Sequence, residues 1–203
     1  LSMIAALCAS ITVLASERLP TEYFTDFSKH LSVQLSPGGD FLSVEVMVGT
    51  ETQVVILDTK TMKPIKNGRH RFMRENFSVS GHTWVSDDRL VFRAERFMKT
   101  EMEVPIPLIM LYAVDYDGKR ENVLASPFAG TELYGATILD PLVDDKRKAL
   151  VLSYTPSGTR PKGGKMNLRN GSLSETTSLP PRTVDIVLDK EKRPRYAIAG
   201  NTN

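Results

Sequence analysis

From Leu31 onward, apolar and polar residues alternate with a period of two, which predicts β-strands rather than helices. In residues 41–48, FLSVEVMV, every second side chain is Leu or Val. The same alternation occurs in residues 89–94, 149–154 and 183–188. Residues 53–57 and 108–114 are continuous apolar runs, which are typical of strands covered on both faces. The pattern therefore predicts an all-β chain.

Turn residues separate these strands and make the pattern repeat. Glycine-containing turns are expected at Pro37–Gly39, Asn67–Gly68, Asp117–Gly118 and Asn170–Gly171. A Gly- or Asp-rich turn followed by a strong strand begins near residues 37, 86, 144 and 189. A second strand, a hairpin and a further short strand follow each of the first three.

A four-stranded antiparallel unit that repeats every 40 to 60 residues or so is typical of a β-propeller blade. We therefore expect residues 16–203 to form an incomplete N-terminal β-propeller domain, with about three four-stranded blades and the start of a fourth. A single closed β-sandwich is the alternative. Residues 21–31, TEYFTDFSKHL, carry the one helical pattern and predict one or two turns of helix.

Residues 1–15 have a different character from the rest of the chain. Twelve of the fifteen are apolar and none is charged. The run is shorter than the roughly 20 residues that a membrane-spanning helix needs, and it ends in Val13-Leu14-Ala15, a small-residue cleavage pattern. We predict an N-terminally clipped signal peptide that is cut after Ala15. The mature protein is then periplasmic or extracellular, with no membrane contact. A buried N-terminal helix and lipidation at Cys8 are the alternatives.

Composition narrows the possible functions. Lys and Arg total 26 against 24 Asp and Glu, a formal net charge of +2, so we predict no nucleic-acid partner. The single cysteine excludes an internal disulfide and a multi-cysteine zinc site, and three histidines leave little for metal chemistry. We accordingly predict no metal and no cofactor.

Family-specific residues occur in order along this pattern. Four elements carry them: LSPGGDFL (35–42), WVSDDRLVF (84–92), AVDYDG (113–118) and DKEKRPR (189–195). In this order and spacing they resemble the N-terminal β-propeller region of secreted bacterial serine peptidases of the prolyl oligopeptidase family. Two departures are visible. Gly38 stands where that family usually has Asp, and the last element lacks the Gly of its usual D-x-x-G-x-x-R pattern.

The resemblance implies a function for the whole protein. In that family a Ser-Asp-His triad lies on a C-terminal α/β-hydrolase domain, with the serine in a GxSxG elbow. No GxSxG occurs in these 203 residues, so the hydrolase domain is expected after residue 203. The propeller would then control which peptides reach that domain, its partner in the same chain. The alternative function is a non-catalytic periplasmic propeller that binds other proteins.

No catalytic, cofactor-binding or metal-binding residue is predicted within this chain. His30 is expected at the start of the first strand, His70 in solvent and His82 packing against or capping a strand. Trp84 is expected to anchor the packing between blades, and Asp88 to accept hydrogen bonds at a hairpin.

A pair of glutamates and a glycine-rich segment are expected to have structural roles only. Glu101 and Glu103 are expected in a solvated loop, and residues 158–166, GTRPKGGKM, in a flexible hairpin rather than a phosphate-binding loop.

Overall fold

The computed structural model describes residues 30–49, 51–71, 77–98, 106–128, 133–145, 147–154 and 161–200. Within these ranges every regular element is a β-strand, so the all-β prediction is confirmed. No helix of this described part is long and apolar enough to cross a membrane. The predicted signal peptide, residues 21–29 of the helical pattern, and Glu101 and Glu103 lie outside the described residues. The last two residues of that pattern, His30 and Leu31, belong to strand β1 (His30–Leu35), so the helix prediction is wrong there.

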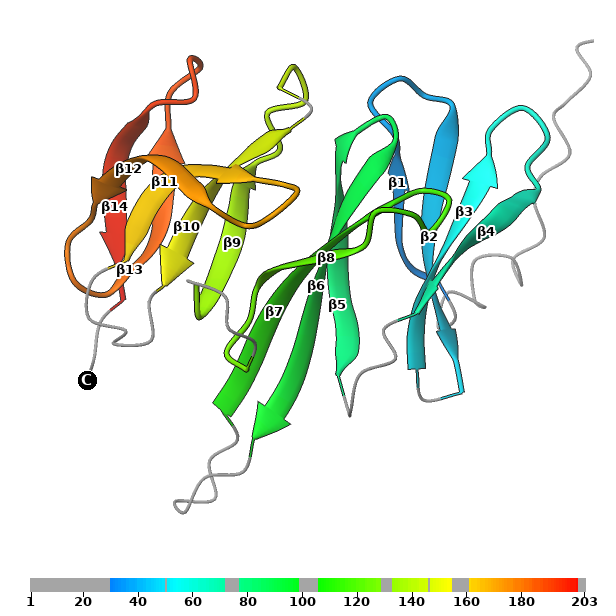
Figure 1. Ribbon diagram of the computed structural model, residues 1–203, viewed down its shortest axis with the longest axis horizontal. Helices are drawn as coiled ribbons and strands as arrows, with labels where there is room; N and C mark the ends of the chain where they lie inside the picture. Colours follow the sequence, from blue (N-terminus) through cyan, green and yellow to red (C-terminus); the bar gives the residue numbers. More distant parts are fainter. Residues whose placement is uncertain are drawn as a thin grey trace, which may run out of the picture.

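In the described residues, fourteen strands form four antiparallel sheets (Figure 1). Sheet 1 contains β1 (His30–Leu35), β2 (Phe41–Val48), β3 (Glu51–Asp58) and β4 (Pro64–Arg71). Sheet 2 contains β5 (Ser78–Ser86), β6 (Arg89–Met98), β7 (Ile106–Asp115) and β8 (Asn122–Ala125). Sheet 3 contains β9 (Gly135–Asp140), β10 (Lys148–Tyr154), β11 (Lys162–Asn167) and β12 (Leu173–Ser178). Sheet 4 contains β13 (Thr183–Leu188) and β14 (Pro194–Ala199).

Each sheet is a meander in which every strand pairs with the next strand along the chain. Tight turns make this possible. Gly39 adopts φ +80° between β1 and β2, a left-handed conformation that favours glycine, and its amide donates to the Ser36 carbonyl at 2.9 Å. Gly118 takes the equivalent conformation after β7, with φ +82°. The turns expected at these two positions are confirmed.

Two expectations about turns and hairpins were wrong. Asn67 and Gly68 form no turn between strands but lie inside β4, where Asn67 has φ 59° and the β3–β4 register shifts between Val55 and Leu57. Asn67 and Gly68 therefore form part of a β-bulge in β4. Residues 162–167 form β11 rather than a flexible hairpin, because they pair along their whole length with β10. Residues 158–160 lie outside the described part.

The sheets stand in chain order across Figure 1, from sheet 1 at the right to sheet 4 at the left. Sheet 2 is covered on both faces. One face packs Trp84, Leu90 and Phe92 against Val54 and Ile56 of sheet 1. The other face packs against sheet 3, in a core formed by Val85, Val91, Leu111, Ala113, Leu124, Ala125, Leu133, Ala136, Ala149, Val151, Met166 and Leu168. Trp84 therefore anchors packing between two sheets, as expected.

Sheets 1 and 4, which lie at the two ends of the row of sheets, have apolar side chains that are exposed to solvent. Val33 and Leu35 of sheet 1 are 56% and 57% exposed. In sheet 4, Val184 is 56% and Tyr196 is 73% exposed, whereas Ile186 is buried. None of the described sheets closes into a ring.

Sheets 2 and 3 also approach each other closely through their backbones. Gly171, in the turn after β11, lies against Leu124 of β8, and a Cβ built on it would stand 2.2 Å from the Leu124 carbonyl oxygen. Gly171 also has φ +74°. Only glycine fits this turn, so the contact between the two sheets depends on it.

Candidate functional site

Buried polar side chains meet where sheet 1 packs on sheet 2. Ser43 of β2 and His82 of β5 approach through Oγ and Nε2 at 2.7 Å, and His82 Nδ1 lies 3.3 Å from Glu45 Oε2. Trp84 Nε1 donates to Ser43 Oγ at 2.9 Å, and that hydroxyl donates to the Gln34 carbonyl at 3.1 Å. Ser43, His82 and Glu45 thus have the connectivity of a catalytic triad.

Burial argues against a nucleophile at Ser43. The hydroxyl lies within hydrogen-bond distance of the Gln34 carbonyl, Trp84 Nε1 and His82 Nε2, so its one proton and two lone pairs all have partners inside the protein. Ser43 is also 0% exposed, so no substrate reaches it. This network therefore joins two sheets.

Sequence reasoning missed Ser43 and Glu45. In β2 the apolar residues Leu42, Val44 and Val46 lie on the half-buried face, whereas Ser43 and Glu45 are 0% and 5% exposed. The polar face of β2 is the one that contacts sheet 2, because His82 and Trp84 supply its hydrogen-bond partners. His82 is buried against a neighbouring strand, as expected.

His70 was expected in solvent, and this was wrong. Its side chain lies between β4 and the turn after β7, with 9% exposure, and Nε2 donates to the Tyr116 carbonyl at 3.0 Å. Its ring also packs on Phe92, 5.6 Å between centroids. Burial lowers the pKa of His70 below its ordinary value of 6.5, and the Tyr116 hydrogen bond opposes this only in part. His30 begins β1, as expected.

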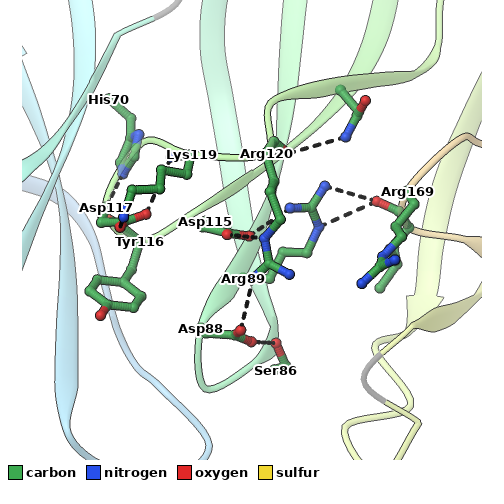
Figure 2. A network of polar contacts seen from close by, with 12 residues as sticks. His70, Ser86, Asp88, Arg89, Asp115, Tyr116, Asp117, Lys119, Arg120 and Arg169 are labelled. Carbon is green, nitrogen blue, oxygen red and sulfur yellow. Dashed lines mark hydrogen bonds and ion pairs between the residues drawn. The ribbon is translucent and has the colours of Figure 1, made fainter.

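A second polar network lies between sheets 2 and 3 (Figure 2). Arg89, the first residue of β6, is 6% exposed. Its Nη1 donates to Asp115 Oδ1 at 2.7 Å, and its Nη2 donates to the Leu168 carbonyl of sheet 3 at 3.0 Å. Asp115 also pairs with Arg120 through Oδ2 and Nε. The two cations hold the buried carboxylate between them, so each ion is paired.

Asp88 extends this network to the surface. Its Oδ1 accepts from the Ser86 hydroxyl at 2.6 Å and its Oδ2 from Arg120 Nη2 at 3.1 Å. These bonds confirm the expected role of Asp88 at the hairpin. The Ser86 hydroxyl and, next, Arg120 hold the pKa of Asp88 below its usual value.

Beside this network is a cavity of about 420 Å³ between the turns of sheets 2 and 3. Its lining has four arginines and two acids and consists of Asp88, Arg89, Arg120, Glu121, Asn122, Arg147, Leu168 and Arg169. Sequence reasoning missed these arginines, because they come from four turns that are far apart in the chain. In the described residues, no group of three His, Cys, Asp or Glu side chains could hold a metal ion.

The fold and these networks define an all-β protein of successive antiparallel four-stranded sheets joined by buried polar groups. No family model matches the chain, and no curated protein matches its sequence.

Proposed function

We propose that this chain is the N-terminal part of the β-propeller of a secreted serine oligopeptidase. In this proposal, sheets 1 to 3 are complete blades and β13–β14 begin a fourth. The propeller admits peptides to a Ser-Asp-His hydrolase domain that follows residue 203, and it excludes folded proteins by size. The protein acts in the periplasm or outside the cell, after removal of residues 1–15.

The repeated architecture is the observation that carries this proposal. Three consecutive meanders have the same strand order and pack face to face, and a fourth begins in the same way. A propeller is built from such units. The four elements that resemble the peptidase family also fall at equivalent places: each contributes the turn after the first or third strand of a sheet.

The site chemistry agrees with a supporting role for this part of the protein. Ser43, the serine with triad-like neighbours, is inaccessible and already hydrogen-bonded. Catalysis is therefore assigned to the hydrolase domain, where the serine of a GxSxG elbow would be exposed.

Labelling of the complete protein with a fluorophosphonate tests the proposal. We expect one labelled serine located after residue 203, and cleavage of short peptides but not of folded proteins. Labelling of any serine within residues 16–203, or no labelling together with no peptidase activity, would contradict it.

The alternative is a non-catalytic propeller that binds other proteins. The exposed aromatic side chains Phe97 and Phe128, at 63% and 57% exposure, favour it because such groups are common in protein interfaces. Under this alternative the complete protein lacks a reactive serine, and its C-terminal part consists of further blades.

A further inference from the structure

The cavity between sheets 2 and 3 has the properties of a binding site for a small anion. Four turns surround it, the β5–β6 and β7–β8 turns of sheet 2 and the β9–β10 and β11–β12 turns of sheet 3. Its volume of about 420 Å³ is within the range of small-molecule sites, roughly 300–1,000 Å³.

The charge of the cavity favours an anion. Four arginines line it, and the two acids in the lining, Asp88 and Glu121, together with the buried Asp115, leave one positive charge uncompensated. Asp115 pairs with Arg89 and Arg120, and Asp88 pairs with Arg120. The excess charge therefore belongs to Arg147 and Arg169, which come from sheet 3.

Two of the arginines are fixed in place. Arg89 uses three of its five N–H groups, two on the Leu168 carbonyl and one on Asp115. Arg120 is half-exposed and is held by Asp115 and Asp88 through Nε and Nη2, and its Nη1 amino group has no hydrogen-bond acceptor among the described residues. Donors that are already oriented bind a ligand with little loss of side-chain entropy.

The other two arginines are held through their backbones instead. The Arg147 carbonyl accepts from the Leu168 amide at 2.8 Å, and the Arg169 amide donates to Asn167 Oδ1 at 2.8 Å. Within the described residues, neither guanidinium group has an acidic partner in an ion pair. Figure 2 shows Arg169 on the side of the network opposite Asp88 and Arg120.

The geometry points to an oxyanion site in this cavity, in which Arg147, Arg169 and the free Nη1 group of Arg120 bind one carboxylate or phosphate group. Guanidinium groups bind both kinds of oxyanion through paired N–H donors. The lining contains no aromatic side chain on which a base could stack, and only one charge is uncompensated. A single small anion therefore fits better than a nucleic acid. This inference does not depend on the peptidase proposal.

The test is isothermal titration of the complete protein at low ionic strength with inorganic phosphate. A second arm uses an N-acetylated dipeptide with a free C-terminal carboxylate, and the same dipeptide as its amide. We expect phosphate, the free dipeptide or both to bind, and the amide not to bind. If only the free dipeptide binds, the ligand is a peptide C-terminus. If only phosphate binds, the ligand is a molecule that carries a phosphate group.

Variants localise the binding. Arg147→Gln combined with Arg169→Gln removes the two uncommitted cations, and we expect affinity to fall about tenfold or more. Glu121→Gln removes a negative charge from the lining and should tighten binding. Arg71→Gln, on the exposed edge of sheet 1, is the matched control and should leave affinity unchanged. The inference is overturned if neither oxyanion binds, or if the double variant binds as tightly as the unaltered protein.

Discussion

At the scale of single residues, two networks of buried polar groups join neighbouring sheets. Ser43, Glu45 and His82 bridge sheets 1 and 2, and Arg89 and Asp115 bridge sheets 2 and 3. Removing one partner of such a buried pair costs about 3–5 kcal/mol, because the remaining charge is left without compensation. These residues therefore hold neighbouring sheets together.

His70 makes stability depend on pH. Its pKa is lowered in the folded state by burial, so the unfolded chain binds the proton more readily. The contribution of His70 to the free energy of unfolding should be at its maximum above about pH 6.5. It should decline as the pH falls from there toward the pKa of His70 in the folded state. His70→Gln should remove this part of the decline while leaving the contribution of the carboxylates. Denaturant unfolding between pH 7.5 and pH 5 measures it, and identical pH profiles for the two proteins would refute it.

Lys192 occupies a strained position in the turn of sheet 4. It has φ 62°, and it stands where the D-x-x-G-x-x-R pattern usually has glycine. Lys192→Gly and Lys192→Ala both remove the ion pair with Asp140, but only glycine relieves the backbone. We expect the glycine variant to be more stable than the alanine variant by about 1 kcal/mol. Equal melting temperatures for the two would show that the turn is not strained.

At the scale of elements, β6 is an inner strand of sheet 2 whose successive side chains alternate between two hydrophobic cores. Leu90 and Phe92 face sheet 1, whereas Val91 faces sheet 3, and all three are at most 2% exposed. A strand buried on both faces shows a nearly continuous apolar pattern. Toward its end, β6 leaves this environment, and Phe97 is 63% exposed.

This difference along one strand can be measured. Phe92→Ala should lower the free energy of unfolding by about 3–5 kcal/mol, because it leaves a cavity between sheets 1 and 2. Phe97→Ala is the matched control and should change it by only about 0.5 kcal/mol. Comparable losses for the two variants would mean that the face-to-face packing of these sheets is wrong.

Some elements could be predicted from the sequence and others could not. The bounds of β2 and β13 were predicted correctly, because strict alternation between clear turns identifies a strand. The pattern gave no strand at β5, whose polar residues and Gly81 interrupt the alternation. The polar networks could not be predicted, since Ser43 and His82 are 39 positions apart, and the Arg89 contact with Leu168 spans 79.

At the scale of the whole molecule, sheet 2 shares one hydrophobic core with sheet 1 and another with sheet 3. Sheets 1 and 4, at the two ends of the row of sheets, each have one face without a described partner. Val33 and Leu35 mark one end of the row, and Val184 and Tyr196 mark the other. Among the described strands, β14 pairs only with β13, so its outer edge is open. Open edges and apolar faces promote association between chains.

We therefore expect residues 16–203, produced alone, to be aggregated or partly molten, and the complete protein to be soluble and cooperatively folded. Sedimentation velocity and thermal melting of the isolated segment measure this. A monodisperse monomer with one sharp transition would mean that these strands close on themselves, as in the sandwich alternative.

The contact between Gly171 and β8 has a practical consequence for engineering the protein. The turn after β11 has no room for even one methyl group beside the Leu124 carbonyl, so an epitope tag or inserted peptide there would separate sheets 2 and 3. The turn between β3 and β4 differs, because Lys60, Thr61 and Met62 are all exposed. Foreign sequence is tolerated best at exposed turns, and residues 60–62 are the better place to attach a label.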